Sequence, residues 1–260
     1  MKILITGATD GIGLATARKL ISEGHEVLLH GRNAKKLANV TNGFEMNDSE
    51  QYVADLSQLS QVKKLAREII EKHDWLDVLI NNAGVYHSPT PTNEAGLDIR
   101  FAVNTLAPYL LTKELLPLMN ESSRVINLSS AAQAPVDAKA LAGSKNLRAG
   151  EAYAQSKLAL TMWTFELAKQ VAPVLVAVNP KSLLGSKMVK KAFGVDGEDI
   201  NIGAEILCQA ALSEEFKDAS GKYFDNDIEE FGEPHPDAQD QNKCADLVQQ
   251  LDVIIAKYTQ

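Results

Sequence analysis

The chain has 260 residues, of which 45% are hydrophobic and 23% are charged, so it is long enough to bury one large core. Its 26 Lys and Arg against 34 Asp and Glu give a net charge of −8, which disfavours nucleic acids and anionic membranes as partners. The two cysteines lie far apart and exclude a disulfide scaffold, and no apolar run is long enough to predict a membrane span. With no targeting segment recognised, these features predict a cytoplasmic protein.

Short, almost unbroken apolar runs recur along the first two thirds of the chain. They cover residues 3–6, 27–29, 78–80, 125–128 and 174–178, with a weaker run at 51–54. Strands buried on both faces of a parallel sheet have this uniform apolar character. Between them, as at residues 59–70, apolar residues recur every three or four positions, which is typical of helices. The alternation predicts an α/β fold, a doubly wound parallel sheet of the Rossmann type, in a single domain over 1–260.

The last third of the chain departs from this alternation. Residues 182–201 lose the rhythm of strand and helix, and residues 225–240 are rich in acidic side chains. A helical pattern returns at residues 245–256. We therefore expect 182–201 to be a substrate-side addition to the sheet and 225–257 to be a C-terminal one.

A glycine-rich loop at residues 6–13 joins the first predicted strand to the first predicted helix. Glycines allow a tight turn and a close approach of the backbone to a phosphate, and the following helix presents free N–H groups to it. This context predicts a dinucleotide site. The residues expected to bind the cofactor here are Gly7, Thr9, Asp10, Gly11, Ile12 and Gly13.

The residues after the second predicted strand indicate which dinucleotide is bound. A fold that prefers NAD carries an acidic residue about 20 positions after the glycines, where it binds the ribose hydroxyls. Here the region reads His30-Gly31-Arg32, without an acid, and a planar guanidinium suits a 2′-phosphate. Arg32 therefore predicts NADP as the cofactor.

Polar residues also follow the later strands, at the sheet edge where ligands of open parallel sheets bind. Ser130 follows the fifth strand, and Tyr153 and Lys157 come next along the chain. Four residues apart on a helix, Tyr153 and Lys157 share a face. A nearby ammonium group favours the phenolate, so we expect Lys157 to lower the pKa of Tyr153 and Tyr153 to act as general acid or base.

Taken together, these motifs resemble the short-chain dehydrogenase/reductase family. The resemblance rests on Thr-Gly-x-x-x-Gly-x-Gly at 6–13, Asn-Asn-Ala-Gly at 81–84, Asn104, the serine pair at 129–130 and Tyr153-x-x-x-Lys157. It covers residues 1 to about 180. A second Tyr-x-x-x-Lys, Tyr109 to Lys113, precedes the serines, so chain order assigns the chemistry to Tyr153.

The resemblance implies a role for each matching residue. The catalytic residues are expected to be Asn104, Ser130, Tyr153 and Lys157, with Ser130 binding the reacting oxygen and Asn104 supporting a proton relay to Lys157. Further cofactor contacts are expected from Asp55, Leu56, Asn81, Ala83, Gly84, Tyr153, Lys157 and Pro180. The partner is then a small carbonyl or alcohol substrate, and relatives of this kind often form homo-oligomers.

Three features depart from the family pattern. Asp10 stands where many NADP-preferring relatives carry a basic residue, and Lys181 replaces the glycine that usually follows Pro180. The segment between Ser130 and Tyr153 is longer than in many relatives, as in the retinol-dehydrogenase-like and protochlorophyllide-reductase-like branches. Its residues 133–150 are either a substrate lid or a surface insertion.

Other functions stay open at this point. A non-catalytic NADP-binding redox sensor would use the same fold, and reduction of a carbon–carbon double bond would use the same hydride and the same tyrosine. An epimerase or dehydratase usually has a larger C-terminal region than 260 residues allow. The five histidines have no ligand spacing, so no metal site is predicted.

Overall fold

The computed structural model describes residues 1–41 and 51–259. Its core is a sheet of eight strands in the order β3-β2-β1-β4-β5-β6-β7-β8. The strands are β1 (Lys2–Ile5), β2 (Glu26–Gly31), β3 (Gln51–Val53), β4 (Val78–Asn81), β5 (Arg124–Leu128), β6 (Val174–Asn179), β7 (Lys222–Asp225) and β8 (Glu230–Phe231). All pairs are parallel except β7 with β8. The predicted α/β fold and its parallel sheet are confirmed.

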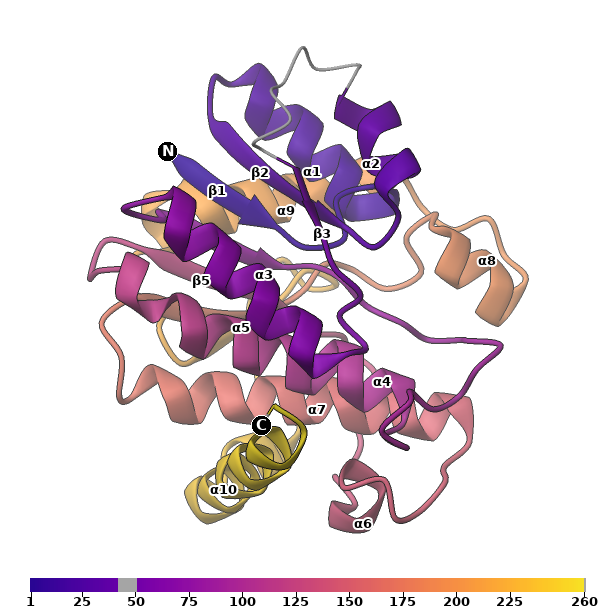
Figure 1. The fold of residues 1–260 in the computed structure, drawn as a ribbon. Helices are drawn as coiled ribbons and strands as arrows, with labels where there is room; N and C mark the ends of the chain where they lie inside the picture. Colours follow the sequence, from indigo (N-terminus) through magenta and orange to yellow (C-terminus); the bar gives the residue numbers. More distant parts are fainter. Residues whose placement is uncertain (42–50, 260) are drawn as a thin grey trace.

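Helices cover both faces of the sheet (Figure 1). On one side lie α1 (Gly11–Ser22), α2 (Ala34–Thr41) and α9 (Ile200–Leu212), and on the other α3 (Leu59–Lys72), α5 (Ala107–Leu115) and α7 (Ala149–Ala168). The C-terminal α10 (Gln241–Tyr258) packs outside α7 and α3. Shorter helices are α4 (Ile99–Phe101), α6 (Ala138–Leu141) and α8 (Lys187–Phe193), and 3-10 turns are η3 (Leu116–Leu118), η4 (Glu214–Phe216) and η5 (Pro236–Ala238).

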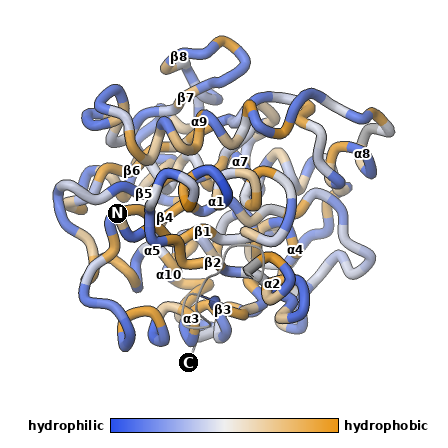
Figure 2. Tube along the Cα trace, turned by 90° about the horizontal axis from the view of Figure 1, so that it is seen from above, coloured by the Kyte–Doolittle hydropathy of each residue, from blue (hydrophilic) through white to orange (hydrophobic). Residues whose placement is uncertain are grey.

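The central strands supply side chains to two separate apolar clusters. Leu4 and Leu28 belong to the cluster under α3, α5 and α7, whereas Ile3 and Ile5 belong to the one under α1 and α9. This alternation follows from strand geometry, in which successive side chains point to opposite faces. Figure 2 shows β1 and β2 as an apolar centre with hydrophilic loops outside it. Burial on both faces is the reason why these strands read as uniform apolar runs.

The last third of the chain contains more regular structure than its sequence pattern predicts. The 182–201 segment holds α8, a short helix capped by Ser186, whose Oγ accepts from Val189 N. The helical pattern at 245–256 is the inner part of α10, which Asp240 caps through the N–H groups of Asn242 and Lys243. The two-residue β8 is too short to give an alternating pattern, so the sequence did not indicate it.

Within the described residues, no helix combines the length and the apolar character that crossing a bilayer requires. Over the same ranges, no three His, Cys, Asp or Glu side chains are grouped to hold a metal ion.

Candidate active site

The glycine-rich loop connects β1 to α1 in a conformation that its glycines make accessible. Gly7 has φ +69° and Gly11 has φ +55°, both in the left-handed region that favours glycine. A Cβ on Gly13 would lie 2.6 Å from the carbonyl oxygen of Gly7, so this position cannot carry a side chain. By contrast, apart from its chain neighbours and the adjoining helix backbone, no atom of the described residues lies within 4 Å of a Cβ built on Gly11. The loop is closely packed beneath and open above, which fits the approach of a phosphate to the first turn of α1.

Neighbouring side chains hold this loop in place. Asn82 donates from Nδ2 to the carbonyl oxygens of Thr6, at 2.8 Å, and Gly7, at 3.2 Å. The hydroxyl of Thr6 accepts from Ala83 N at 3.0 Å. Asn82 lies inside the Asn-Asn-Ala-Gly motif, but the sequence-based set of cofactor residues named only the other three positions. The motif itself was the signal that could have identified it.

His30 forms a second support that sequence reasoning did not identify. Its Nδ1 accepts from Gly7 N at 3.2 Å, and its Nε2 lies 3.0 Å from the carbonyl oxygen of Ala54. Burial lowers the pKa of His30 to about 4, so the ring is neutral near pH 7. A neutral ring can accept at Nδ1 and donate at Nε2, which links the phosphate loop to the end of β3.

The predicted adenosine side of the site is built at the ends of β2 and β3. Thr9 contacts the end of β2, because a Cβ on Gly31 would lie 2.5 Å from its methyl group. Arg32 is exposed, and across the described residues it forms no hydrogen bond or ion pair. Asp55 accepts from Ser57 N at 2.9 Å and is partly exposed, while Leu56 is buried in the core. These positions leave the Arg32 guanidinium available to a 2′-phosphate.

The Asn-Asn-Ala-Gly motif also connects the glycine-rich loop to the residues predicted for catalysis. Asn81 is buried and donates from Nδ2 to Asn127 Oδ1 at 2.8 Å, so its side chain faces the core. A Cβ on Gly84 would lie 3.6 Å from both Asn104 Oδ1 and Lys157 Nζ. Gly84 therefore lies against the two polar side chains that the family pattern brings together.

Asn104 lies in a π-helical turn, η2 (Ala102–Leu106), between α4 and α5. Its Oδ1 accepts from Val85 N at 2.8 Å, and its Nδ2 donates to Val85 O at 3.0 Å and to Ser156 Oγ at 2.9 Å. Single π-helical turns are frequent at functional sites. The turn aims Asn104 at α7, where Ser156 in turn donates to the carbonyl oxygen of Tyr153 at 2.7 Å.

Ser130, Tyr153 and Lys157 converge beyond the end of β5. The side chain of Ser130 hydrogen bonds to the Tyr153 phenol. Lys157 donates from Nζ to the carbonyl oxygen of Leu128 at 2.6 Å, and Nζ lies 5.7 Å from the centre of the Tyr153 ring. The structure thus brings together three of the four side chains predicted for catalysis, and the fourth, Asn104, contacts the same helix through Ser156.

Burial determines the ionisation of Lys157 and Tyr153. The pKa of Lys157 falls to about 8, because removal from water penalises the ammonium form. Burial raises the pKa of Tyr153, and the hydrogen bond with Ser130 only partly opposes this. The pKa of Tyr153 is therefore raised above its usual value, whereas the sequence led us to expect a lowered one. Nζ is engaged by Leu128, and desolvation of the phenol is the larger effect.

Tyr86 packs directly on the proposed acid. The ring centroids of Tyr86 and Tyr153 are 5.0 Å apart, and a Cβ on Gly150 would lie 3.2 Å from the Tyr86 hydroxyl. Tyr86 thus lies between Tyr153 and the end of the 133–150 segment. An aromatic ring therefore lies beside the phenol of Tyr153.

The loop after β6 is held by Asp227, in the turn between β7 and β8. Asp227 accepts from Ser182 Oγ at 2.6 Å and from Asn179 Nδ2 at 2.9 Å. Pro180 is buried, and its carbonyl oxygen accepts from Asn226 at 3.1 Å. Lys181 has φ +105°, a conformation that favours glycine. The substitution of the usual glycine therefore leaves the backbone of this loop strained.

The second Tyr-x-x-x-Lys pair has a different environment. Tyr109 is buried in α5 and donates to Asp252 of α10 at 2.9 Å, and Lys113 lies 2.7 Å from the same carboxylate. Burial and Asp252 raise the pKa of Tyr109. This pair joins α5 to the C-terminal helix and lies apart from Ser130, as chain order predicts.

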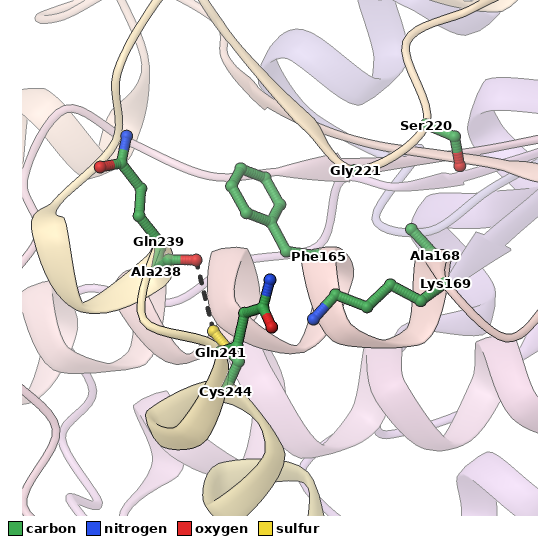
Figure 3. A pocket seen from close by; sticks show the side chains of 9 residues that line it. All are labelled: Phe165, Ala168, Lys169, Ser220, Gly221, Ala238, Gln239, Gln241 and Cys244. Carbon is green, nitrogen blue, oxygen red and sulfur yellow. Dashed lines mark hydrogen bonds between the residues drawn. The ribbon is translucent and has the colours of Figure 1, made fainter.

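A pocket of about 360 Å³ lies between α7, the start of β7 and α10 (Figure 3). Phe165, Lys169 and Cys244 are among its lining residues. The Cys244 thiol donates to the carbonyl oxygen of Ala238 at 3.3 Å, and burial raises its pKa to about 11. A protonated, engaged thiol is a poor nucleophile, so Cys244 does not indicate a reaction in this pocket.

Comparison with known proteins finds similar sequences and similar folds. A family model described as short chain dehydrogenase matches residues 1–192. Human retinol dehydrogenase 13 is 32% identical over 265 residues, covering 92% of this chain and 80% of that protein. A solved protein of Mycobacterium paratuberculosis superposes with a TM-score of 0.81 at 25% identity, covering 98% of this chain and 93% of that one. A short-chain dehydrogenase of Shigella flexneri, solved with NADP, gives a TM-score of 0.67 at 26% identity, with coverage of 87% and 96%.

Proposed function

The chain belongs to the short-chain dehydrogenase family, and from this premise we propose that it is an NADP-dependent oxidoreductase that interconverts a carbonyl compound and its alcohol. The observation that carries the proposal is the convergence of Ser130, Tyr153 and Lys157 beyond the end of β5. A protein that only binds a dinucleotide has no need of an acid at this place. The NADP complex of the Shigella flexneri relative and the exposed Arg32 support the choice of cofactor.

The residues present fit a dinucleotide. The open space above Gly11 and the first turn of α1 would receive the pyrophosphate, and Arg32 would bind the 2′-phosphate. Gly84 and Lys157 would hold the ribose on the nicotinamide side. When bound, NADPH supplies the hydride for reduction.

The side chains of the protein then hold and transfer the proton. Tyr153 donates its phenolic proton to the substrate oxygen, and the raised pKa keeps that proton on the phenol until charge develops on the oxygen. Ser130 donates a hydrogen bond to the same oxygen. Lys157, charged below about pH 8, stabilises the phenolate that remains. Asn104 fixes the main chain at Val85 and the hydroxyl of Ser156, and so orients α7.

For the substrate we propose an apolar aldehyde or alcohol. Two observations support this class. Human retinol dehydrogenase 13, by its name, acts on an apolar isoprenoid alcohol. The ring of Tyr86, packed on Tyr153, offers an aromatic surface next to the reacting oxygen.

The test is a panel of retinal, shorter apolar aldehydes, ketones, quinones and enones, with NADPH or NADH consumption as the readout. We expect oxidation of NADPH by an aldehyde or ketone and little oxidation of NADH. Turnover with enones alone would instead support reduction of a carbon–carbon double bond. Tight NADPH binding without turnover on any member would support a non-catalytic sensor.

A further inference from the structure

Lys187 reaches from the substrate-side segment to the phosphate loop. It is the first residue of α8, and its Nζ lies 2.5 Å from Oδ2 of Asp10. Asp10 caps α1, where Oδ1 accepts from Gly11 N at 3.0 Å. Figures 1 and 2 both show α8 standing apart from the sheet. The ion pair therefore connects a peripheral helix to the start of the helix that would receive the pyrophosphate.

The pair is poorly placed to stabilise the fold. The side chains of Lys187 and Asp10 are 75% and 50% exposed, and exposed ion pairs contribute little to stability because water and salt screen them. Lys190, on the same helix, pairs with Asp196 of its own segment at 2.6 Å and does not reach the loop. Lys187 and Lys190 thus have different partners, and Lys187 is the one that contacts the loop.

Asp10 is ionised in this environment. Partial burial raises its pKa, but hydrogen bonds from Lys187 and Gly11 N and the charges of Lys187 and Lys36 outweigh burial, so the net pKa is lowered. A carboxylate at this place would repel the phosphates of a dinucleotide. Lys187 offsets that charge at hydrogen-bonding distance, and Lys36 adds a more distant positive charge.

We propose that Lys187 is a specificity-determining residue for the 2′-phosphorylated dinucleotide, acting through Asp10. By neutralising the Asp10 carboxylate, Lys187 lets an acidic residue cap α1 without repelling the extra phosphate that distinguishes NADPH from NADH. The inference rests on the proposed NADP function. It also explains how Asp10 can occupy a position where a basic residue is expected in a protein that prefers NADP.

The test is a double-mutant cycle of cofactor binding. Dissociation constants of NADPH and NADH are measured by fluorescence titration at low ionic strength for the unmodified protein, Lys187→Met, Asp10→Asn and the double variant. We expect Lys187→Met to weaken the binding of NADPH about tenfold and the binding of NADH by less than about threefold. The repulsion from the exposed Asp10 carboxylate grows with the charge of the ligand. The double variant should recover NADPH binding to within about twofold of the unmodified protein, since no carboxylate then remains to be neutralised. Lys190→Met is the matched control and should leave both constants unchanged.

The outcomes separate this inference from the proposed function. If the unmodified protein prefers NADPH and Lys187→Met changes nothing, the role of Lys187 is overturned while the proposed function stands. Equal weakening of both cofactors without recovery in the double variant also overturns it, because Lys187 would then act independently of Asp10. A preference of the unmodified protein for NADH would overturn the proposed function and this inference with it.

Discussion

The Nζ of Lys157 lies 2.6 Å from the carbonyl oxygen of Leu128, so the buried lysine of α7 is fixed to the last residue of β5. Ser129 strengthens the same junction, because its Oγ lies 2.7 Å from Thr161 Oγ1, one turn further along α7. Both contacts place α7 relative to the strand end that carries Ser130. The position of the catalytic helix thus depends on a residue that is itself expected to take part in the chemistry.

The lowered pKa of Lys157 predicts a pH dependence. As pH rises through about 8, Lys157 loses its proton, and with it the charge that stabilises the phenolate of Tyr153. We expect kcat/KM for NADPH, which reports ionisations of the free enzyme, to fall about tenfold for each pH unit above that value. In Lys157→Met the residual kcat/KM should show no such decline above pH 8. A decline near pH 8 that persists in this variant would assign the ionisation to another group.

Arg32 predicts the preference between cofactors. The unmodified protein should bind NADPH at least about tenfold more tightly than NADH, a difference of ~1.4 kcal/mol in binding free energy. Arg32→Asp should reduce or invert that ratio, because an acid favours the free ribose hydroxyls. Titration of both dinucleotides measures the ratio, with the exposed Lys35→Met as a control. Equal affinities in the unmodified protein would contradict the prediction.

The sequence predicted the parts of the fold that depend on local pattern. Strands such as β1 and β5 are buried on both faces, and this burial appears directly in their composition. Ser130 was assigned to the site because it follows a strand of the parallel sheet, whereas Tyr153 and Lys157 were assigned from their Tyr-x-x-x-Lys motif and the family resemblance. Chain order alone separated Tyr153 from Tyr109, and the hydrogen bond of Tyr109 with Asp252 agrees with that choice.

Contacts between segments far apart in the chain could not be predicted from the sequence. His30 reaches Gly7 across 23 positions and Lys187 reaches Asp10 across 177, and neither pairing has a periodic or compositional signal. The direction in which the pKa of Tyr153 shifts was predicted wrongly for a related reason. A spacing of four residues shows that Lys157 shares a helix face with Tyr153, but the carbonyl oxygen that engages Lys157 belongs to another element.

The 133–150 segment can be tested as a lid. It is anchored at its start, where Asp137 N donates to Gln155 Oε1 at 2.9 Å and Ala140 is buried, whereas residues 142–146 are exposed. Replacing 142–146 with a shorter Gly-Ser linker should therefore leave the fold and NADPH affinity nearly constant. We expect the relative kcat/KM for aldehydes of different length to change by more than about threefold if the segment covers the substrate. An unchanged substrate profile would identify it as a surface insertion.

His30 predicts an acid-sensitive fold. Its pKa is about 4 in the folded protein and about 6.5 in an unfolded chain. Between those values the unfolded state binds the additional proton, so the free energy of unfolding falls as pH drops through this window, by up to about 3 kcal/mol. Denaturant unfolding at pH 7.5 and 4.5 measures the loss. His30→Asn should be less stable at pH 7.5 but lose less on acidification, and the exposed His87→Asn should behave like the unmodified protein.

Tyr153 is predicted to be the proton donor, and the chain supplies its own control. Tyr153→Phe retains the ring that packs on Tyr86 but removes the transferable proton. NADPH should bind as before, because the phosphate loop and Arg32 are unchanged, while kcat should fall at least about 100-fold, the scale of a lost general acid. Tyr109→Phe removes the hydroxyl of the same sequence motif, which hydrogen bonds to Asp252 and Lys113, so it should lower stability without lowering kcat. Rates for both variants, measured with a substrate that the unmodified enzyme turns over, decide the assignment, and equal losses in the two would place the acid elsewhere.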